Sequence, residues 1–349
     1  MITADAPSFD RLKINERDRL IDEYSQRALG RFVRLCKAHV AFHCFFALII
    51  AIECLTFGLF FSFWTRSFLL AFPLAAFILT LFVYIVLVST FQAKKTEQFW
   101  RLKKSFLDAC GKTSRHLGQA EHHFSQASAA ERLVALLQHQ EYRFYPLLKT
   151  PLTPKLSCFL HWRDVLGMKE VLLLSAIDHY IQLVPSRPTD IELHTHLANA
   201  FVLLSHLYFE PRLRLKKGEL HYSESGSFAQ ELSEKFASAS KSAVEEFTIL
   251  DTYAPNDPWV HSQLAACYHH LKMSKEEIAA YEKIIHLCPE DLDSTYRLGV
   301  LYFQEGLNAK ALEIFQLLKR KAYPKAEDLL KFYKSSLRKL LANSSKLSL

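Results

Sequence analysis

Two long apolar runs, residues 40–63 and 68–91, constrain this chain more than any other feature of its sequence. Each run would form a helix of about 36 Å, long enough to cross a hydrocarbon core of about 30 Å. The connector, residues 64–67, leaves room only for a tight helical hairpin. A core helix of a soluble bundle rarely stays apolar on every face over such a length. We therefore expect two membrane spans, and we prefer them to two core helices of a soluble bundle.

Basic residues flank the hairpin on its two outer sides, and the connector has only Arg66. The flanking residues are Arg27, Arg31, Arg34 and Lys37 before the first run, and Lys94, Lys95, Arg101, Lys103 and Lys104 after the second. Cytoplasmic loops of membrane proteins carry an excess of Lys and Arg. The sequence therefore predicts an integral membrane protein with two spans and both termini in the cytoplasm.

Glu53 lies near the middle of the first apolar run. A charged carboxylate at that depth costs several kcal/mol, so we expect it to be protonated or hydrogen-bonded. Thr80 and Tyr84 on the second run lie at a suitable depth to be its partners. We favour a polar clasp between the two helices, and the alternative is an ion pathway or an oligomer contact.

Cys36, His39 and His43 share one helical face at the start of the first run. These side chains could hold a metal, but a His-rich helix start at a membrane interface is the commoner arrangement, and we expect no metal or cofactor. The seven cysteines are widely spaced and include no CxxC pair. This pattern argues against a disulfide framework and favours a reducing compartment.

The rest of the chain has a helical composition, with only 9 glycines among 349 residues. A net charge of +7 is too small and too dispersed for a nucleic-acid partner. We expect Gly111 and Gly118 to interrupt a helical linker region. Prolines 146, 151 and 154 then break the pattern, and we place the start of the C-terminal domain at residue 151.

The C-terminal half repeats itself at a period of 34 residues. The matched pairs are Leu264 and Leu298, Ala265 and Gly299, Tyr268 and Tyr302, Ile278 and Leu312, Tyr281 and Phe315, Ile284 and Leu318, and Pro255 and Pro289. The spacing predicts helix pairs that stack on one another. A less regular unit upstream has Leu197, Ala198 and Phe201 on its first helix.

This pattern resembles the tetratricopeptide repeat (TPR), most closely in Leu298-Gly299, Tyr302, Ala311, Phe315 and Pro324. The copy before it is weaker, because Glu277 occupies a position where the family prefers a small residue. The resemblance implies a curved stack whose first helices line a groove that binds a protein or peptide. By family position, the partner-binding residues would include Asn199, Trp259, His269, Tyr296, Arg297 and Phe303.

One branch of the family holds the C-terminal carboxylate of chaperones with lysines, asparagines and an arginine. Asn199 and Arg297 fall on such positions. Thr195 and Asp293 replace the lysines, and Gln263 replaces the second asparagine. The resemblance therefore does not favour chaperone tails over another extended peptide or a partner helix.

No catalytic motif is present, so we expect a protein that is not an enzyme. The leading hypothesis is a membrane-anchored adaptor that recruits a protein or peptide partner to a lipid bilayer. The alternatives are a hairpin protein that resembles the inclusion-membrane or effector proteins of intracellular bacteria, and a channel or transporter subunit that uses Glu53.

The sequence thus predicts an all-α protein, with a transmembrane helical hairpin followed by a TPR-like α-solenoid. The expected parts are a cytoplasmic N-terminal segment (1–38), the hairpin (39–92), a helical linker region (93–150), the repeat domain (151–341) and a flexible tail (342–349).

Overall fold

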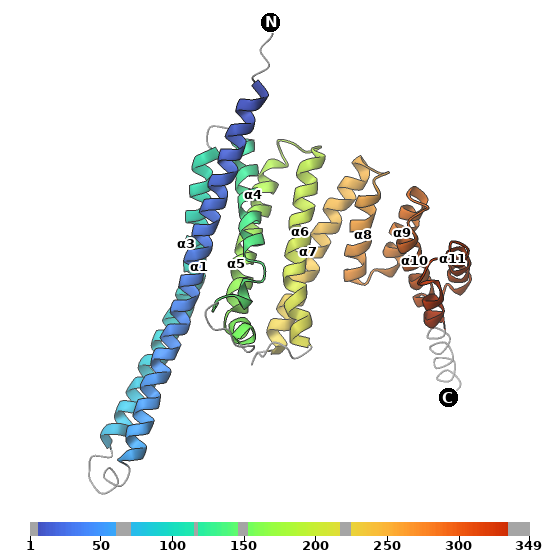
Figure 1. Ribbon diagram of the computed structural model, residues 1–349. Coiled ribbons are helices and arrows are strands. Elements are labelled where there is room, and N and C mark those ends of the chain that lie inside the picture. The colour runs from blue at the N-terminus through green and yellow to red at the C-terminus, as the bar shows by residue number, and fades with distance from the viewer. Residues whose placement is uncertain (1–5, 61–70, 115–117, 146–152, 217–224, 334–349) are drawn as a thin grey trace, which may run out of the picture. The chain divides into compact units, whose positions relative to one another are not determined.

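The structure is a computed structural model that describes residues 6–60, 71–114, 118–145, 153–216 and 225–333 (Figure 1). Every regular element in these ranges is helical, which confirms the all-α prediction. The chain divides into two compact units, Met1–Leu183 and Val184–Leu349, and each is described by itself. The predicted connector (64–67), the tail (342–349) and the predicted break near residue 150 lie outside the described residues.

The first unit is built on two very long helices. Its elements are α1 (Ala6–Leu59), α3 (Ala71–Ser114), α4 (Gln119–Leu136), the 3₁₀ helix η3 (Gln140–Tyr142) and α5 (Thr153–Leu183). The polar segment before the first apolar run continues into that run without a break. α5 packs on α4 and belongs to this unit, whereas the sequence predicted these residues as part of the repeat domain.

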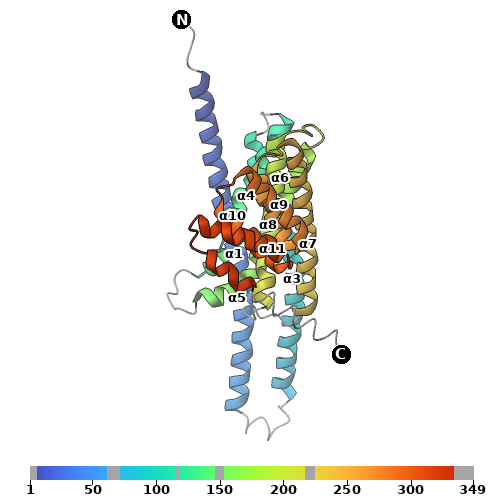
Figure 2. The same ribbon diagram turned by 90° about the vertical axis from the view of Figure 1, so that its right-hand side faces the viewer.

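The apolar halves of α1 and α3 are long and apolar enough to cross a membrane. Figures 1 and 2 show these ends extending beyond α4 and α5. Only 6% and 0% of their most apolar windows are buried inside the structure. The large exposed side chains include Phe45, Leu48, Ile52 and Leu55 on α1, and Ile78, Leu79, Phe82 and Ile85 on α3.

The other halves of α1 and α3 pack with α4 and α5 around a buried aromatic cluster. The Phe32 ring lies 5.5 Å from that of Phe99 and 6.3 Å from that of Phe144. Of the two expected glycine breaks, Gly118 precedes α4 with a φ of 91°, whereas Gly111 lies within α3. A Cβ at Gly111 would come within 2.6 Å of Gln126 Nε2, so this glycine permits close approach of α4.

Glu131 on α4 makes the stability of the first unit depend on pH. Burial raises the pKa of its carboxyl from the ordinary 4.5 to about 7, and the Tyr180 hydroxyl hydrogen bond opposes this rise. As the pH rises, the unfolded chain therefore releases this proton at a lower pH than the folded chain does. The free energy of unfolding falls as the pH rises from about 4.5 to about 7. We expect Glu131→Gln to remove this loss. At pH 8 the free energy of unfolding of the variant should exceed that of the wild type by about 3 kcal/mol.

Thermal unfolding of the full chain in detergent at pH 5 and pH 8 measures this effect. The control is Glu97→Gln, at an exposed carboxylate that pairs with Arg101 on the same helix. An unchanged pH dependence in Glu131→Gln would show that this carboxyl is not the source.

The second unit is a series of helix pairs. Its elements are α6 (Ile191–Lys216), α7 (Ser225–Tyr253), α8 (Pro258–Leu271), α9 (Ser274–Leu287), α10 (Leu292–Gln304), α11 (Asn308–Arg320) and the 3₁₀ helix η4 (Ala326–Asp328). Each helix packs with its neighbour in the chain. The α8–α9 and α10–α11 pairs consist of helices of 13 or 14 residues, as the 34-residue period predicts. Residues 326–333 after α11 are helical, and residues 334–349 lie outside the described residues.

The pairs begin and turn in the same way. Asp257 and Asp291 cap α8 and α10, because each side chain accepts a backbone N–H from the first turn. Each first helix then ends with a residue in the left-handed region, Lys272 (φ 60°) or Gly306 (φ 80°). The next N–H donates back to Tyr268 O at 2.9 Å in one pair and to Tyr302 O at 2.8 Å in the other. These shared turns give each pair the same geometry.

The first helix of the upstream pair, α6, and the first helix of the next pair, α8, each carry a buried histidine with the same kind of contact. His194 Nε2 on α6 lies 3.0 Å from Pro188 O, and His261 Nε2 on α8 lies 2.9 Å from Pro255 O. Both imidazoles are almost fully buried. The structure therefore places α6 in the role of a first helix, as Leu197 and Ala198 predicted.

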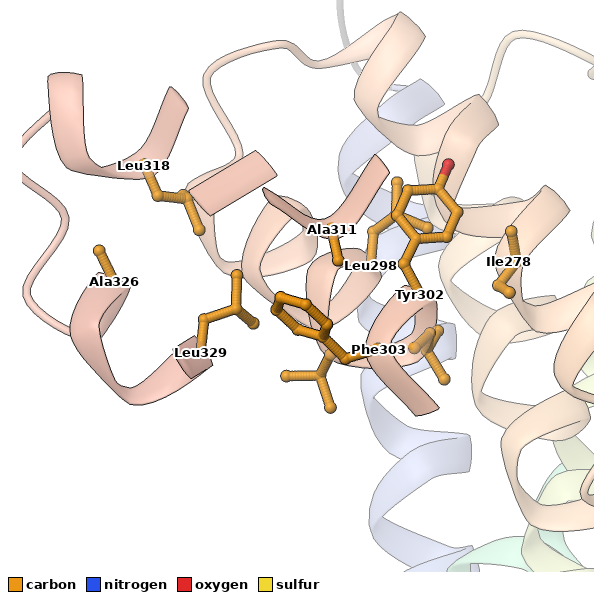
Figure 3. Packing of buried hydrophobic residues seen from close by; sticks show 10 residues of the cluster. Ile278, Leu298, Tyr302, Phe303, Ala311, Leu318, Ala326 and Leu329 are labelled. Atoms are coloured by element: carbon orange, nitrogen blue, oxygen red, sulfur yellow. The ribbon is translucent and has the colours of Figure 1, made fainter. Parts of the chain in front are cut away.

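Small residues bring α10 close to its neighbours. A Cβ at Gly299 would lie 2.9 Å from both Ile314 Cγ2 of α11 and Leu329 Cδ2. Ala311 is completely buried in the same core, which Figure 3 shows together with Tyr302, Phe303 and Leu329. Gly299 and Ala311, two small residues of the TPR-like pattern, thus lie where helices approach closely.

Candidate protein-binding face

Two predicted groove residues, Trp259 and His269, lie on one exposed stripe along α8. Trp259, Ser262, Ala266 and His269 follow one another at helical spacing, and all four are exposed. We call these four residues the α8 stripe. Its other face is buried, because Leu264 packs with Phe247 in the core between α7 and α8. α8 is therefore packed against α7 on its Leu264 side, and the α8 stripe is left uncovered.

Trp259 is the large apolar residue of the stripe, with 39% of its surface exposed. Pro258 begins the helix, and the Asp257 carboxylate accepts the Trp259 N–H at 2.9 Å. The indole ring rests edge-on against Phe247, with ring centroids 5.8 Å apart. A fixed and exposed indole is the kind of group that dominates binding energy at protein interfaces.

The structure joins His269 and Arg297 directly, with Arg297 Nη2 2.8 Å from His269 Nδ1, and also through Glu277. Sequence reasoning treated Glu277 only as a departure from the repeat pattern. The Glu277 side chain is 3% exposed. Arg297 Nη2 donates to Glu277 Oε1 at 3.1 Å, and His269 Nδ1 lies 3.2 Å from Glu277 Oε2. These contacts link α8, α9 and α10. Arg297 thus neutralises a carboxylate of its own chain, which explains how the repeat tolerates an acidic residue at this position.

The remaining predicted partner-binding residues differ in exposure. Tyr296 is half-buried, and its ring lies 5.8 Å from the ring of Tyr323. Asn199 is half-buried on α6. Phe303 is completely buried, with its ring 5.5 Å from that of Tyr333, so it contributes to packing and presents no surface to a partner in this structure (Figure 3). Its exposure could not be judged from the repeat position alone.

Glu53 has one of its two expected partners. Thr80 Oγ1 donates to Glu53 Oε1 at 2.6 Å, which joins α1 to α3 as the clasp interpretation predicts. Tyr84 contacts another residue instead, because its hydroxyl lies 3.1 Å from His43 Nδ1. The channel hypothesis for Glu53 stays a prediction.

The histidines near Cys36 do not gather around it. His39 Nδ1 hydrogen-bonds Leu35 O at 2.9 Å, and His43 Nδ1 contacts Tyr84. Cys36 instead lies beside His161 and Asp164 of α5. The helical spacing of residues 36–43 did not indicate that Cys36 would lie beside α5.

The fold and the stripe define an all-α protein whose second unit is made of TPR-like helix pairs. None of the family models and none of the curated proteins searched matches the chain. Two similar solved structures are the assembly chaperone of RpL4 (Acl4) and the TPR2AB domain of yeast Sti1 in complex with an HSP90 peptide.

The likeness to these two structures is low. Acl4 is 12% identical with a TM-score of 0.26, over 73% of this chain and 99% of that chain. The Sti1 domain is 17% identical with a TM-score of 0.25, over 69% of this chain and 95% of that chain. The helix pairs of this chain are themselves what is TPR-like.

Proposed function

We propose that this protein is a membrane-anchored adaptor. The α1–α3 hairpin inserts into a lipid bilayer, and the helix pairs of the second unit bind a protein or peptide partner through the α8 stripe. The observation that carries the proposal is the uncovered apolar surface of the hairpin, because its most apolar windows are 6% and 0% buried. Exposed apolar surface of this extent is costly in water and favourable in hydrocarbon.

The Thr80–Glu53 hydrogen bond supports insertion. It partners one carboxylate oxygen inside the hairpin, and polar groups in the bilayer must find partners within the protein. Anchoring also has a functional consequence. A binding face held at a membrane raises the effective concentration of its partner there.

The α8 stripe supports binding. Trp259 offers a large apolar contact at one end, and the half-exposed side chain of His269 offers a polar contact at the other. Ser262 and Ala266 between them are small and permit close approach of a helix or an extended segment. These features favour a peptide or helical segment with at least one large apolar side chain.

Photo-crosslinking of the full chain in membranes tests this binding role. A benzophenone amino acid at position 266 is expected to give a discrete adduct with a partner. Trp259→Ala is expected to lower the yield of that adduct by roughly tenfold or more, since interface tryptophans contribute about 2 kcal/mol or more. The matched control places the crosslinker at Ala279, an exposed alanine on α9 outside the stripe.

Three further observations decide the outcome. Trp100→Ala, which changes an exposed tryptophan in the first unit, should leave the adduct unchanged. Equal adducts from positions 266 and 279 would contradict the assignment of the face. An adduct insensitive to Trp259→Ala would do the same.

A further inference from the structure

Three metal-ligating side chains from distant parts of the sequence meet in the first unit. Cys36 of α1 and His161 and Asp164 of α5 each place one ligand atom within 4.8 Å of the other two. His161 and Asp164 share a face of α5 because they are three residues apart. Cys36 and His161 are fully buried, and Asp164 is 7% exposed. A thiol, an imidazole and a carboxylate are the donors that Zn²⁺ uses in proteins.

The imidazole of His161 is held with one nitrogen aimed into this cluster. Its Nε2 lies 3.0 Å from the Tyr145 hydroxyl, and its ring stacks on Phe144 with centroids 3.9 Å apart. Its Nδ1 is buried without a hydrogen-bond partner and lies 3.9 Å from Asp164 Oδ2, too far for a hydrogen bond. A buried polar atom without a partner is costly. A cation between Nδ1 and Oδ2 would give His161 Nδ1 the partner that it lacks.

The Asp164 carboxylate is also oriented from outside the cluster. Lys95 of α3 forms an ion pair with Oδ1, which leaves Oδ2 facing His161. Metal sites commonly have outer partners of this kind, in which a second hydrogen bond fixes each ligand. Tyr145 would do this for His161, and Lys95 would do it for Asp164.

We propose that Cys36, His161 and Asp164 form a Zn²⁺ site that joins α1 to α5. The ligands are Cys36 Sγ as a thiolate, His161 Nδ1 and one Asp164 oxygen, and the thiol proton leaves to solvent when the ion binds. Three protein ligands leave a fourth tetrahedral position for a water molecule. The site ties the polar half of α1 to the helix that ends the first unit.

Zinc content of the full chain, purified in detergent without chelator, tests the proposal. We expect about one zinc per wild-type chain after reconstitution with Zn²⁺ and desalting. Cys36→Ser and His161→Gln should each lower bound zinc at least tenfold. The matched control is Cys110→Ser, because Cys110 is also buried in the first unit but lies outside the cluster, and it should keep the zinc.

Two measurements keep the test decisive if those variants fold poorly. Tyr145→Phe retains all three ligands and should weaken Zn²⁺ binding about 10- to 100-fold in a competition with a chelating dye. Co²⁺ in the wild-type protein should give a thiolate-to-metal charge-transfer band that Cys110→Ser retains. A wild-type chain that takes up neither Zn²⁺ nor Co²⁺ would overturn the proposal in favour of a hydrogen-bonded cluster. Equal loss of zinc in Cys110→Ser would overturn it too.

Discussion

Replacing Arg297 with methionine is expected to lower the free energy of unfolding of the second unit by about 3–5 kcal/mol. The Glu277 side chain is 3% exposed and would lose the guanidinium that neutralises it. Burying a carboxylate without a cation costs far more than losing a surface ion pair. His269 Nδ1 would remain 3.2 Å from Glu277 Oε2, but it would not replace the permanent charge of the guanidinium.

The double variant Arg297→Met with Glu277→Met isolates this cause. Removing both charges should restore most of the lost stability, since well-packed apolar residues often replace a buried pair at little cost. Thermal unfolding of the full chain in detergent should show a loss of roughly 6–20 °C for the single variant and a much smaller loss for the double. If the two substitutions add instead, Glu277 is not the residue that Arg297 stabilises.

Phe303→Ala is the second large effect, with an expected loss of about 3–5 kcal/mol from the second unit. The ring, on α10, is completely buried in the same core as Leu329 (Figure 3). Its centroid lies 5.5 Å from that of Tyr333. Its removal leaves a cavity and loses the buried apolar area. If Phe303 were an exposed groove residue, the same change would cost little stability.

Trp259→Ala is the matched comparison for Phe303→Ala. Trp259 is 39% exposed, so its removal should cost far less stability while it weakens partner binding. Unfolding midpoints of the two variants in the same detergent provide the measurement. A small loss for Phe303→Ala would contradict the packing of the C-terminal helices.

The sequence predicted those parts of the fold that depend on periodicity. The described parts of the two apolar runs lie in the long helices α1 and α3, apart from residue 60 just after α1. The 34-residue period corresponds to the α8–α9 and α10–α11 pairs. Gly299 was identified from its place in the TPR-like pattern, and the structure shows that a Cβ there would collide with Ile314 and Leu329.

Contacts between distant residues were harder to predict. Glu277 appeared only as an irregular repeat residue, and its compensation by Arg297 depends on how α10 packs against α9. Cys36 meets His161 only because α1 and α5 lie side by side. The burial of Phe303 likewise depends on the chain that follows α11. Helical spacing describes the face of one helix and carries no information about which other helix will cover it.

Extraction of the full-length protein from cell membranes with alkaline carbonate tests the central claim most directly. A chain anchored by the α1–α3 hairpin should stay in the membrane pellet and enter solution only with detergent, because its exposed apolar helices require hydrocarbon around them. Release of the intact chain into the supernatant without detergent would show that the hairpin does not span a bilayer, and it would contradict the account of this protein as a membrane-anchored adaptor.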